Sequence, residues 1–394
     1  MKRFVALLMS ALVLTALAGA QEERDLSALY RENFRNANRP IKLELLRSAQ
    51  DVPGDQLAPF FDDAARYVAT NVAQVASEAD LQQMLRLTTA GVQQTGATAS
   101  LEPLWYVFES IRDIPLRIQM LDAFAAIGGG DSDLIVRLTG WVGTQNELFR
   151  TGSFSTDLRI IDRAVRALTG FGDARSFPAL VDAAMVGYSS SITAEARRGL
   201  FEMEDPTTMA IAVFRDRPVD QKPALFDFFF RASEIGDEDR DRFVTAALEN
   251  VLAVRVIGEG TLPAVRLMRY QANIWLRDRA YAPATAALVG HFNRTFADFD
   301  RGLTPQPYVI EALDALGAMG TEAAARRLTE FLDVVNRQTE FGTQFNTDIT
   351  LATLRNIERL GFSLSYNSLF YTTLLNYPPR VKDAARRAMA ALTR

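Results

Sequence analysis

The sequence predicts an all-α protein built as a stack of helix pairs. Apolar residues recur at helical spacing along most of the chain, and no stretch alternates apolar and polar residues as a half-buried strand does. Glycine and aspartate turns interrupt these apolar runs again and again. The chain has 394 residues, whereas a single hydrophobic core rarely extends beyond about 250–300 residues. We therefore expect several domains or a repeat array, and the recurring turns favour the array.

The first 20 residues are typical of a secretory signal peptide. Lys2 and Arg3 precede the apolar run "FVALLMSALVLTALA", and a small-residue motif ends at Ala20. This pattern predicts cleavage after Ala20 and a periplasmic or secreted bacterial protein. An uncleaved anchor or a buried helix is the alternative, but the run is shorter than the roughly 20 residues of a membrane-spanning helix. Because the segment has no twin-arginine pair and the chain has no cysteine, we expect Sec-type export without a lipid anchor.

The composition excludes several classes of function. Without cysteine the chain forms no disulfide, thiolate metal site or cysteine nucleophile. The formal net charge of −5 argues against a nucleic-acid partner, because nucleic acids are bound by clustered positive charge. No later segment is long and apolar enough to span a bilayer, so we expect no stable membrane insertion after signal cleavage.

Helix pairs follow a charged segment at 21–39, which we expect to be a loose lead-in or a capping helix. The clearest pair surrounds "TGFGD" at 169–173. Its apolar stripes are Leu158, Ile161, Val165 and Leu168 before the turn, and Phe177, Leu180, Val181 and Ala184 after it. Gly172 suits the left-handed end of the first helix, Asp173 is placed to cap the second, and Pro178 fits its first turn.

Turns of this kind recur along the chain. They lie near positions 54, 96, 130, 172, 205, 236, 278, 320 and 361. Their spacing of 31 to 42 residues is typical of two-helix repeats. The pattern predicts an α-solenoid, that is an α-α superhelix, of about eight or nine irregular helix pairs over residues 40–394. Residues 300–308 are the best candidate for a break between domains, although an inter-repeat loop explains them equally well.

Two segments resemble HEAT repeats, "GDARSFPALVDAA" at 172–184 and "PPRVKDAARRAMAALTR" at 378–394. In such repeats a first helix ends at glycine or aspartate, and a second helix then begins with a Pro-Ala-Leu-like sequence. The resemblance extends over most of the chain from about Arg39, and three or four units carry it specifically. It implies an α-solenoid that binds other proteins, and it brings no catalytic residues with it. The closing segment is also similar to the end of exported HEAT-repeat proteins of spirochaetes.

Two echoes within the sequence suggest a duplication. "YSSSITAEARR" at 188–198 and "YPPRVKDAARR" at 377–387 share the tyrosine, a β-branched residue, an alanine and the arginine pair. Upstream, "FSTD" at 154–157 and "FNTD" at 345–348 each precede a Gly-Phe by the same distance, although the apolar positions between slip by one.

Few residues are candidates for catalysis. His291 is the only histidine, so a Ser-His-Asp triad would have to use it, yet no triad signature flanks it. One imidazole also cannot build a histidine-rich metal site. We expect His291 to be a structural or surface residue. Glu109, in "FES", is similar in setting to the Glu-Ser helix of lytic transglycosylases, but the downstream glycine-rich segment is absent. We expect Glu109 to face solvent beside a core stripe.

Two further motifs have simple structural interpretations. Asp237, Asp239 and Asp241 alternate as in a calcium loop, but Arg242 occupies the sixth position and Leu248 the twelfth, where glycine and glutamate are required. We expect an acidic first turn of a helix instead. Residues 128–133, "GGGDSD", could cradle a phosphate at a helix N-terminus, but without a preceding strand or P-loop spacing they indicate a turn.

The aromatic segments 103–108 and 226–230 are too broad for one helix stripe, so the sequence leaves open whether they belong to the core or to an interface. We assign no catalytic, cofactor-binding or metal-binding residue and no cofactor. The predicted function is a non-catalytic exported scaffold that binds another protein. The alternatives are a peptidoglycan-acting cell-envelope enzyme on a helical scaffold, using Glu109, and a structural protein that self-associates.

Overall fold

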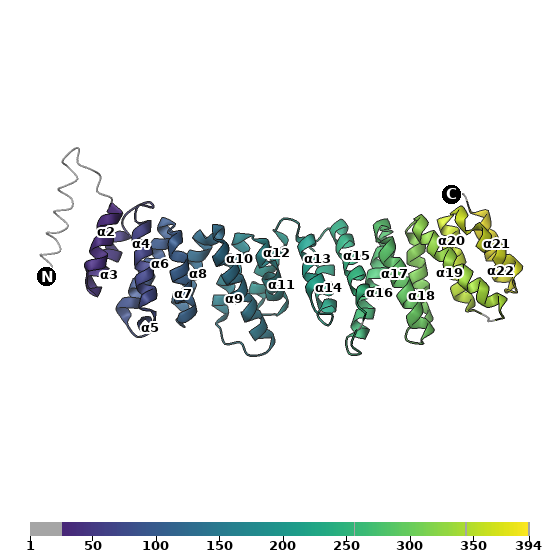
Figure 1. Cartoon of the computed structure of the whole chain (residues 1–394), viewed down its shortest axis with the longest axis horizontal. Coiled ribbons are helices and arrows are strands. Elements are labelled where there is room, and N and C mark those ends of the chain that lie inside the picture. The colour runs from purple at the N-terminus through teal and green to yellow at the C-terminus, as the bar shows by residue number, and fades with distance from the viewer. Residues whose placement is uncertain (1–25, 256, 343–344, 393–394) are drawn as a thin grey trace, which may run out of the picture. The chain divides into compact units, whose positions relative to one another are not determined.

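The computed structural model describes residues 26–255, 257–342 and 345–392. The chain divides into two compact units, residues 1–203 and 204–394. The described residues of both units form α-helices and short 3-10 turns and contain no strand (Figure 1). The predicted all-α class is therefore confirmed.

Unit 1 has two layers of helices, and the two helices of each pair lie in different layers. The first layer contains α3 (Arg39–Ala49), α6 (Ala79–Thr95), α8 (Ile114–Ile127), α10 (Leu158–Phe171) and α12 (Ser190–Phe201). The second contains α2 (Leu26–Asn36), α4 (Ala58–Thr70), α7 (Leu101–Ser110), α9 (Ser132–Arg150) and α11 (Phe177–Met185). Each helix packs against its neighbours within its layer, and the short α5 (Val72–Val75) follows α4. Unit 1 thus holds four complete pairs between the single helices α2 and α12.

Unit 2 repeats this arrangement. Its first layer contains α14 (Lys222–Phe230), α16 (Leu262–Arg279), α18 (Gln306–Ala318), α20 (Thr347–Leu360) and α22 (Pro379–Ala390). Its second contains α13 (Pro206–Asp216), α15 (Asp237–Ala253), α17 (Thr285–Asp300), α19 (Glu322–Glu340) and α21 (Tyr366–Leu374). The described residues therefore contain eight complete pairs, in agreement with the predicted solenoid of about eight or nine.

The structure tests some of the predicted segment boundaries and leaves others untested. The predicted signal peptide, residues 1–20, lies outside the described residues. Within the charged segment 21–39, the structure describes α2 from Leu26 onward. The candidate break at 300–308 is the turn between α17 and α18, inside unit 2, and the division between units lies after Met203 instead.

Most predicted turns lie where the chain leaves the helical conformation. Five of the predicted glycines have positive φ, namely Gly54, Gly96, Gly172, Gly320 and Gly361. The turn predicted near Asp278 is displaced, because α16 continues through Asp278 and the left-handed residue is Ala280, with φ 48°. Asp173 also differs from its predicted role, since its carboxylate accepts from the Arg175 amide and caps a short 3-10 turn before α11.

The apolar stripes around Gly172 form the core as predicted, with one exception. Seven of the eight predicted positions are buried, whereas Leu158 at the first turn of α10 is 37% exposed. The apolar residues of α18 and α19 on either side of the turn at Gly320 are also buried, namely Leu313, Leu316, Leu328, Phe331 and Leu332. Burial of such stripes against neighbouring pairs is what stabilises a repeat array.

The two units match helix for helix, which extends the duplication suggested by the sequence. At the start of each unit a buried lysine closes the end of the preceding helix. Lys42 donates from Nζ to the carbonyl oxygens of Phe34 and Arg35, and Lys222 donates in the same way to Phe214 and Arg215. Each ammonium also lies over the phenylalanine ring, at 4.6 and 4.8 Å from the centroid. A cation at the negative end of a helix dipole is a favourable arrangement.

In each unit a buried asparagine links the last two helices of the second layer, α9 to α11 and α19 to α21. Asn146 donates to the Ala179 carbonyl at 2.9 Å, and Asn336 donates to the equivalent Ser368 carbonyl at 3.0 Å. In unit 2 the Tyr377 hydroxyl donates to Asn336 Oδ1 at 3.0 Å. In unit 1 the corresponding Tyr188 hydroxyl has no hydrogen-bond partner among the described residues. The two units therefore share the asparagine contact and differ in the hydrogen bond of the tyrosine hydroxyl.

Candidate binding surfaces

His291 lies inside α17 and is 4% exposed. Its Nε2 lies 3.4 Å from the Thr295 hydroxyl, and Nδ1 has no hydrogen-bond partner among the described residues. Burial, together with the nearby Arg269 guanidinium, lowers the pKa of His291 to about 3. The imidazole is therefore neutral and enclosed, which makes it a core residue rather than an exposed catalytic base.

The aspartates of 237–241 form the start of α15, as expected for an acidic first turn. Asp237 and Asp239 make ion pairs with Arg240 and Arg242 one turn along the helix. Asp241 is buried and accepts from Trp275 Nε1 at 2.7 Å. Arg279 also pairs with both Asp237 and Asp241, at 3.2 and 3.4 Å, so arginine side chains occupy the positions around these carboxylates where a metal ion would have to bind.

The glycine turn at 128–130 is a 3-10 turn between α8 and α9. Asp131 follows it and caps α9 by accepting from the Leu134 amide at 2.8 Å. A carboxylate therefore already occupies the N-terminal end of α9, where a phosphate would have to bind.

The predicted aromatic segments are mainly core. In residues 226–230, Phe226 and Phe229 are fully buried. In residues 103–108, the Trp105 and Phe108 rings pack at 5.2 Å between centroids, and both are buried. Tyr106 is the exception, because its side chain points outward and is 55% exposed.

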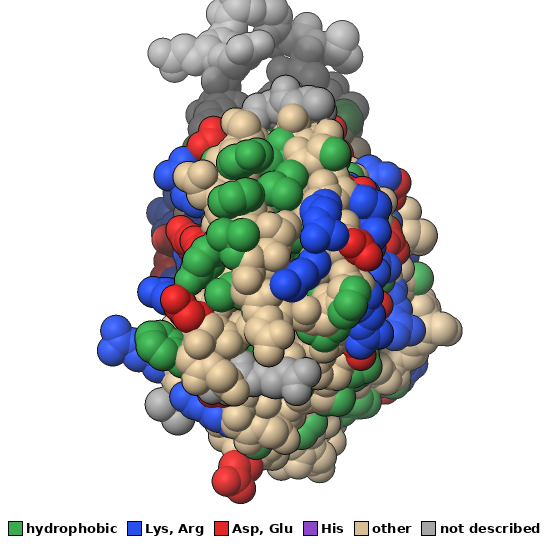
Figure 2. Space-filling view, turned by 90° about the vertical axis from the view of Figure 1, so that its right-hand side faces the viewer, with side chains coloured by type: hydrophobic (Ala, Val, Ile, Leu, Met, Phe, Trp, Pro, Cys, Tyr) green, Lys and Arg blue, Asp and Glu red, His purple; other side chains and the backbone are tan. Residues whose placement is uncertain are grey.

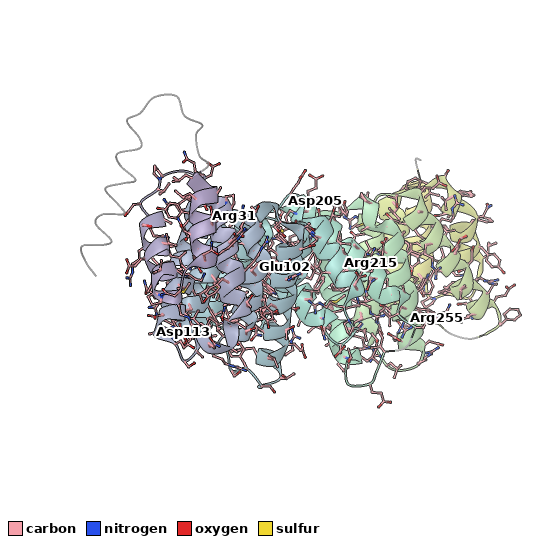
Figure 3. All side chains as sticks on the ribbon, turned by 60° about the vertical axis from the view of Figure 1, so that its left-hand side comes forward. Arg31, Glu102, Asp113, Asp205, Arg215 and Arg255 are labelled. Carbon is pink, nitrogen blue, oxygen red and sulfur yellow. The ribbon has the colours of Figure 1, made fainter. Side chains whose placement is uncertain are left out.

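Tyr106 lines a cleft across the second layer of unit 1. We define the α4–α7–α9 cleft by Arg66 of α4, Glu102, Tyr106 and Glu109 of α7, and Arg137 of α9. Three successive pairs supply these side chains, and Figure 3 shows Glu102 on its helix. The buried Trp105 and Phe108 on the inner side of α7 fix the outward direction of Tyr106.

The charges of the α4–α7–α9 cleft are only partly paired. Arg137 and Glu102 approach to 3.7 Å, and both side chains are exposed. Neither Arg66 nor Glu109 takes part in an ion pair among the described residues, and both are exposed. An exposed tyrosine between unpaired charges of both signs is suited to contact with a protein surface. Sequence reasoning missed this combination because the residues belong to three different repeats.

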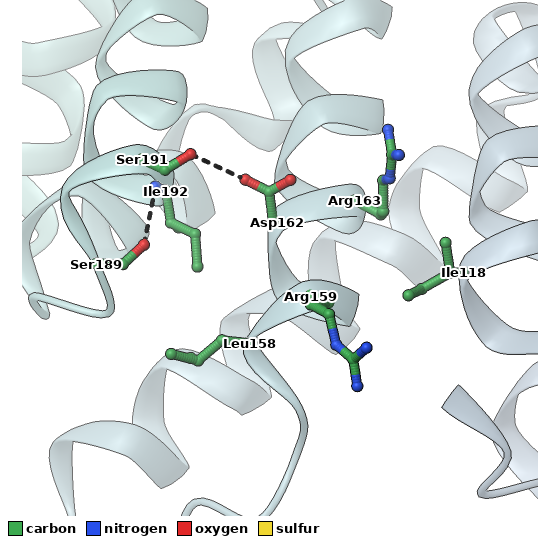
Figure 4. A pocket seen from close by; sticks show the side chains of 8 residues that line it. All are labelled: Ile118, Leu158, Arg159, Asp162, Arg163, Ser189, Ser191 and Ile192. Carbon is green, nitrogen blue, oxygen red and sulfur yellow. Dashed lines mark hydrogen bonds between the residues drawn. The ribbon is translucent and has the colours of Figure 1, made fainter. Parts of the chain in front are cut away.

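A second pocket lies in the first layer of unit 1, between α8, α10 and α12 (Figure 4). The Ser191 hydroxyl donates to Asp162 at 3.4 Å, and Ser189 caps α12 by accepting from the Ile192 amide. The pocket places a serine beside a carboxylate but supplies no imidazole, since the only histidine is buried in unit 2. The geometry therefore does not provide a serine-nucleophile triad.

No helix in the described part of the chain is both long and apolar enough to cross a membrane. Within the described residues, no three histidine, cysteine or acidic side chains gather in a way that could hold a metal ion.

Comparison with known proteins gives one positive finding. Residues 310–333 match the family model described as PBS lyase HEAT-like repeat. The matched segment covers the end of α18, the turn at Gly320 and the first part of α19, which together form one helix pair. No curated protein matches the chain. The match makes this helix pair similar to a HEAT-like repeat, and the same two-layer arrangement of helix pairs continues through each unit.

Proposed function

We propose that this protein is a non-catalytic, exported scaffold that binds another protein through the α4–α7–α9 cleft. The observation that carries the proposal is the exposed Tyr106 between Arg66 and Arg137. Tyrosine and arginine are the side chains most enriched among residues that dominate protein–protein binding energy. The ring stands on a helix whose opposite side is buried, so binding would require little ordering of the surface.

Site-specific crosslinking in the native cell envelope tests this proposal. A photo-reactive phenylalanine analogue replaces Tyr106, and a matched protein carries the analogue at Leu267, which is equally exposed at 56% on α16. We expect one defined adduct at position 106 that is absent at position 267. No specific adduct at position 106 would contradict the proposal. An adduct between two copies of the chain would support the self-associating alternative instead.

The same preparation tests the remaining alternatives. The basic residues, apolar run and small-residue motif of the first 20 residues support export. N-terminal sequencing of the periplasmic protein should begin at Gln21, and recovery of an intact Met1 in the cytoplasm would contradict export. Peptidoglycan turnover by the purified protein that is abolished in Glu109→Gln would contradict a non-catalytic role, because Glu109 is the exposed carboxylate of the cleft that makes no ion pair among the described residues.

A further inference from the structure

The α4–α7–α9 cleft of unit 1 consists of two hollows that lie end to end along α7. The larger hollow, of about 520 Å³, reaches Thr70 and Glu109, which stand near the ends of α4 and α7. The smaller hollow, of about 350 Å³, reaches Asp131 and Asp133 at the start of α9. The residues that line both hollows, and so join them into one groove, are Arg66, Ala99, Glu102, Trp105 and Arg137.

The groove is open although its helices have neighbours on both sides. In the second layer of unit 1, α2 packs against α4, and α11 packs against α9. The last described pair of unit 2 differs, because α21 and α22 each have a described layer neighbour on one side, α19 and α20. Figure 2 looks onto this end of unit 2 and shows hydrophobic side chains on its surface. Exposure there follows from the position of the pair, whereas the groove lies within a continuous layer.

Negative charge lies at both ends of the groove. At one end, Glu109 is exposed and makes no ion pair among the described residues. At the other end, Asp131 and Asp133 line the smaller hollow, and none of the ion pairs among the described residues includes either carboxylate. Arg175 interacts electrostatically with Asp133, but it is already paired with Asp173 at 2.7 Å.

Positive charge lies between the two acidic ends. Arg66 is exposed and takes part in no ion pair among the described residues. Arg137 is balanced by Glu102, whose carboxylate lies 3.7 Å from its guanidinium. Trp105, which lines both hollows, is 3% exposed and gives the middle of the groove an apolar floor. The groove therefore presents negative, positive and negative charge in order along its length.

The spacing of these charges sets the length of a matching ligand. Asp133 precedes Arg137 by four residues on α9, which is about 6 Å along the helix axis. Glu109 follows Glu102 by seven residues on α7, which is about 10 Å. Because Arg137 and Glu102 are paired, the two acidic ends lie roughly 16 Å apart along the groove. An extended chain covers this distance in about five residue steps.

We propose that the cleft binds an extended segment of about six residues that carries a basic residue at each end and an acidic residue between them. One lysine or arginine would meet the Glu109 carboxylate and the exposed Tyr106 ring, which stands one helical turn before it on the same face of α7. The acidic residue would pair with Arg66, and the second basic residue would pair with Asp133. This inference rests on the proposed scaffold function and adds the chemistry of the segment that the partner presents.

Selection from a library of random linear peptides displayed on phage, with the full chain immobilised, tests the proposal. We expect the enriched peptides to carry Lys or Arg at two positions about five residues apart, with Asp or Glu between them. On Arg66→Glu the middle position should change its preference from acidic to basic, which loss of folding cannot produce. Tyr106→Ala should weaken binding of a peptide selected on the wild type roughly tenfold. The control Arg301→Glu makes the same charge change at an exposed turn of unit 2 and should leave binding unchanged.

Two kinds of result would overturn the inference. Enriched peptides without the alternation of charge, or no enrichment at all, would remove the charge argument. Peptides that bind Tyr106→Ala as tightly as the wild type, or that show the same preference on Arg66→Glu, would have their site elsewhere. Crosslinking at Tyr106 in the cell envelope does not depend on the charge pattern of the partner. An adduct there together with a failed selection would refute this inference alone, whereas absence of the adduct contradicts the scaffold proposal itself.

Discussion

The buried imidazole of His291 should make the protein less stable at mildly acidic pH. In the folded protein its pKa is lowered to about 3 by burial, whereas in the unfolded chain it stays near 6.5. Below pH 6.5 the unfolded state therefore binds more protons, so the free energy of unfolding falls as the pH falls towards 3. For a single group with these two pKa values, the loss between pH 7.5 and pH 5.0 is about 2 kcal/mol.

Urea unfolding at pH 7.5 and pH 5.0 measures this loss, and His291→Gln isolates it. Because the chain has one histidine, other side chains contribute little between these pH values, and their contribution remains in the variant. We expect the variant to lose about 2 kcal/mol less than the wild type over this interval. A control with an added exposed histidine, Asn33→His on α2, should behave like the wild type, since its pKa is similar in both states. Equal pH dependence in the wild type and His291→Gln would refute the assignment of a neutral buried imidazole.

Two matched pairs of substitutions test the packing of the units by urea unfolding. Gly91→Ala on α6 would place a methyl group within the Phe61 ring and should destabilise unit 1 by about 1–3 kcal/mol, whereas Gly140→Ala on α9 meets open space and should stabilise it by about 0.5–1 kcal/mol. Equal effects would contradict the close helix contact. Tyr377→Phe removes the hydrogen bond to a buried asparagine and should cost about 1 kcal/mol, whereas Tyr188→Phe should be nearly neutral. A larger cost at Tyr188 would show that its hydroxyl has a partner.

The architecture was predictable because its turns depend on a few residue types. A left-handed residue at a helix end is usually glycine, so positions such as Gly172 and Gly361 mark helix ends in the sequence itself. The displaced turn at α16 shows the limit of this signal, because Ala280 adopts the left-handed conformation without a glycine to mark it. The division after Met203 was not predictable either, because the chain there continues with the same composition and turn chemistry as between other pairs.

The candidate surfaces were harder to predict because each is assembled from several repeats. The α4–α7–α9 cleft unites Arg66, Tyr106 and Arg137, which the sequence separates by a repeat length each. Periodicity placed Tyr106 within an aromatic segment, but it could not decide which ring of that segment faces outward.

Comparison of equivalent residues in the two units shows which features the common fold requires. Features that both units keep, such as the buried lysines Lys42 and Lys222, serve the common scaffold. Where equivalent positions differ, the difference is not a requirement of the shared fold, because each unit folds with its own arrangement. Tyr188 and Tyr377 are such a pair: Tyr377 donates to the buried Asn336, whereas the Tyr188 hydroxyl has no hydrogen-bond partner among the described residues. Comparison of the two tyrosine-to-phenylalanine variants therefore measures the effect of one local hydrogen bond on a common helix arrangement.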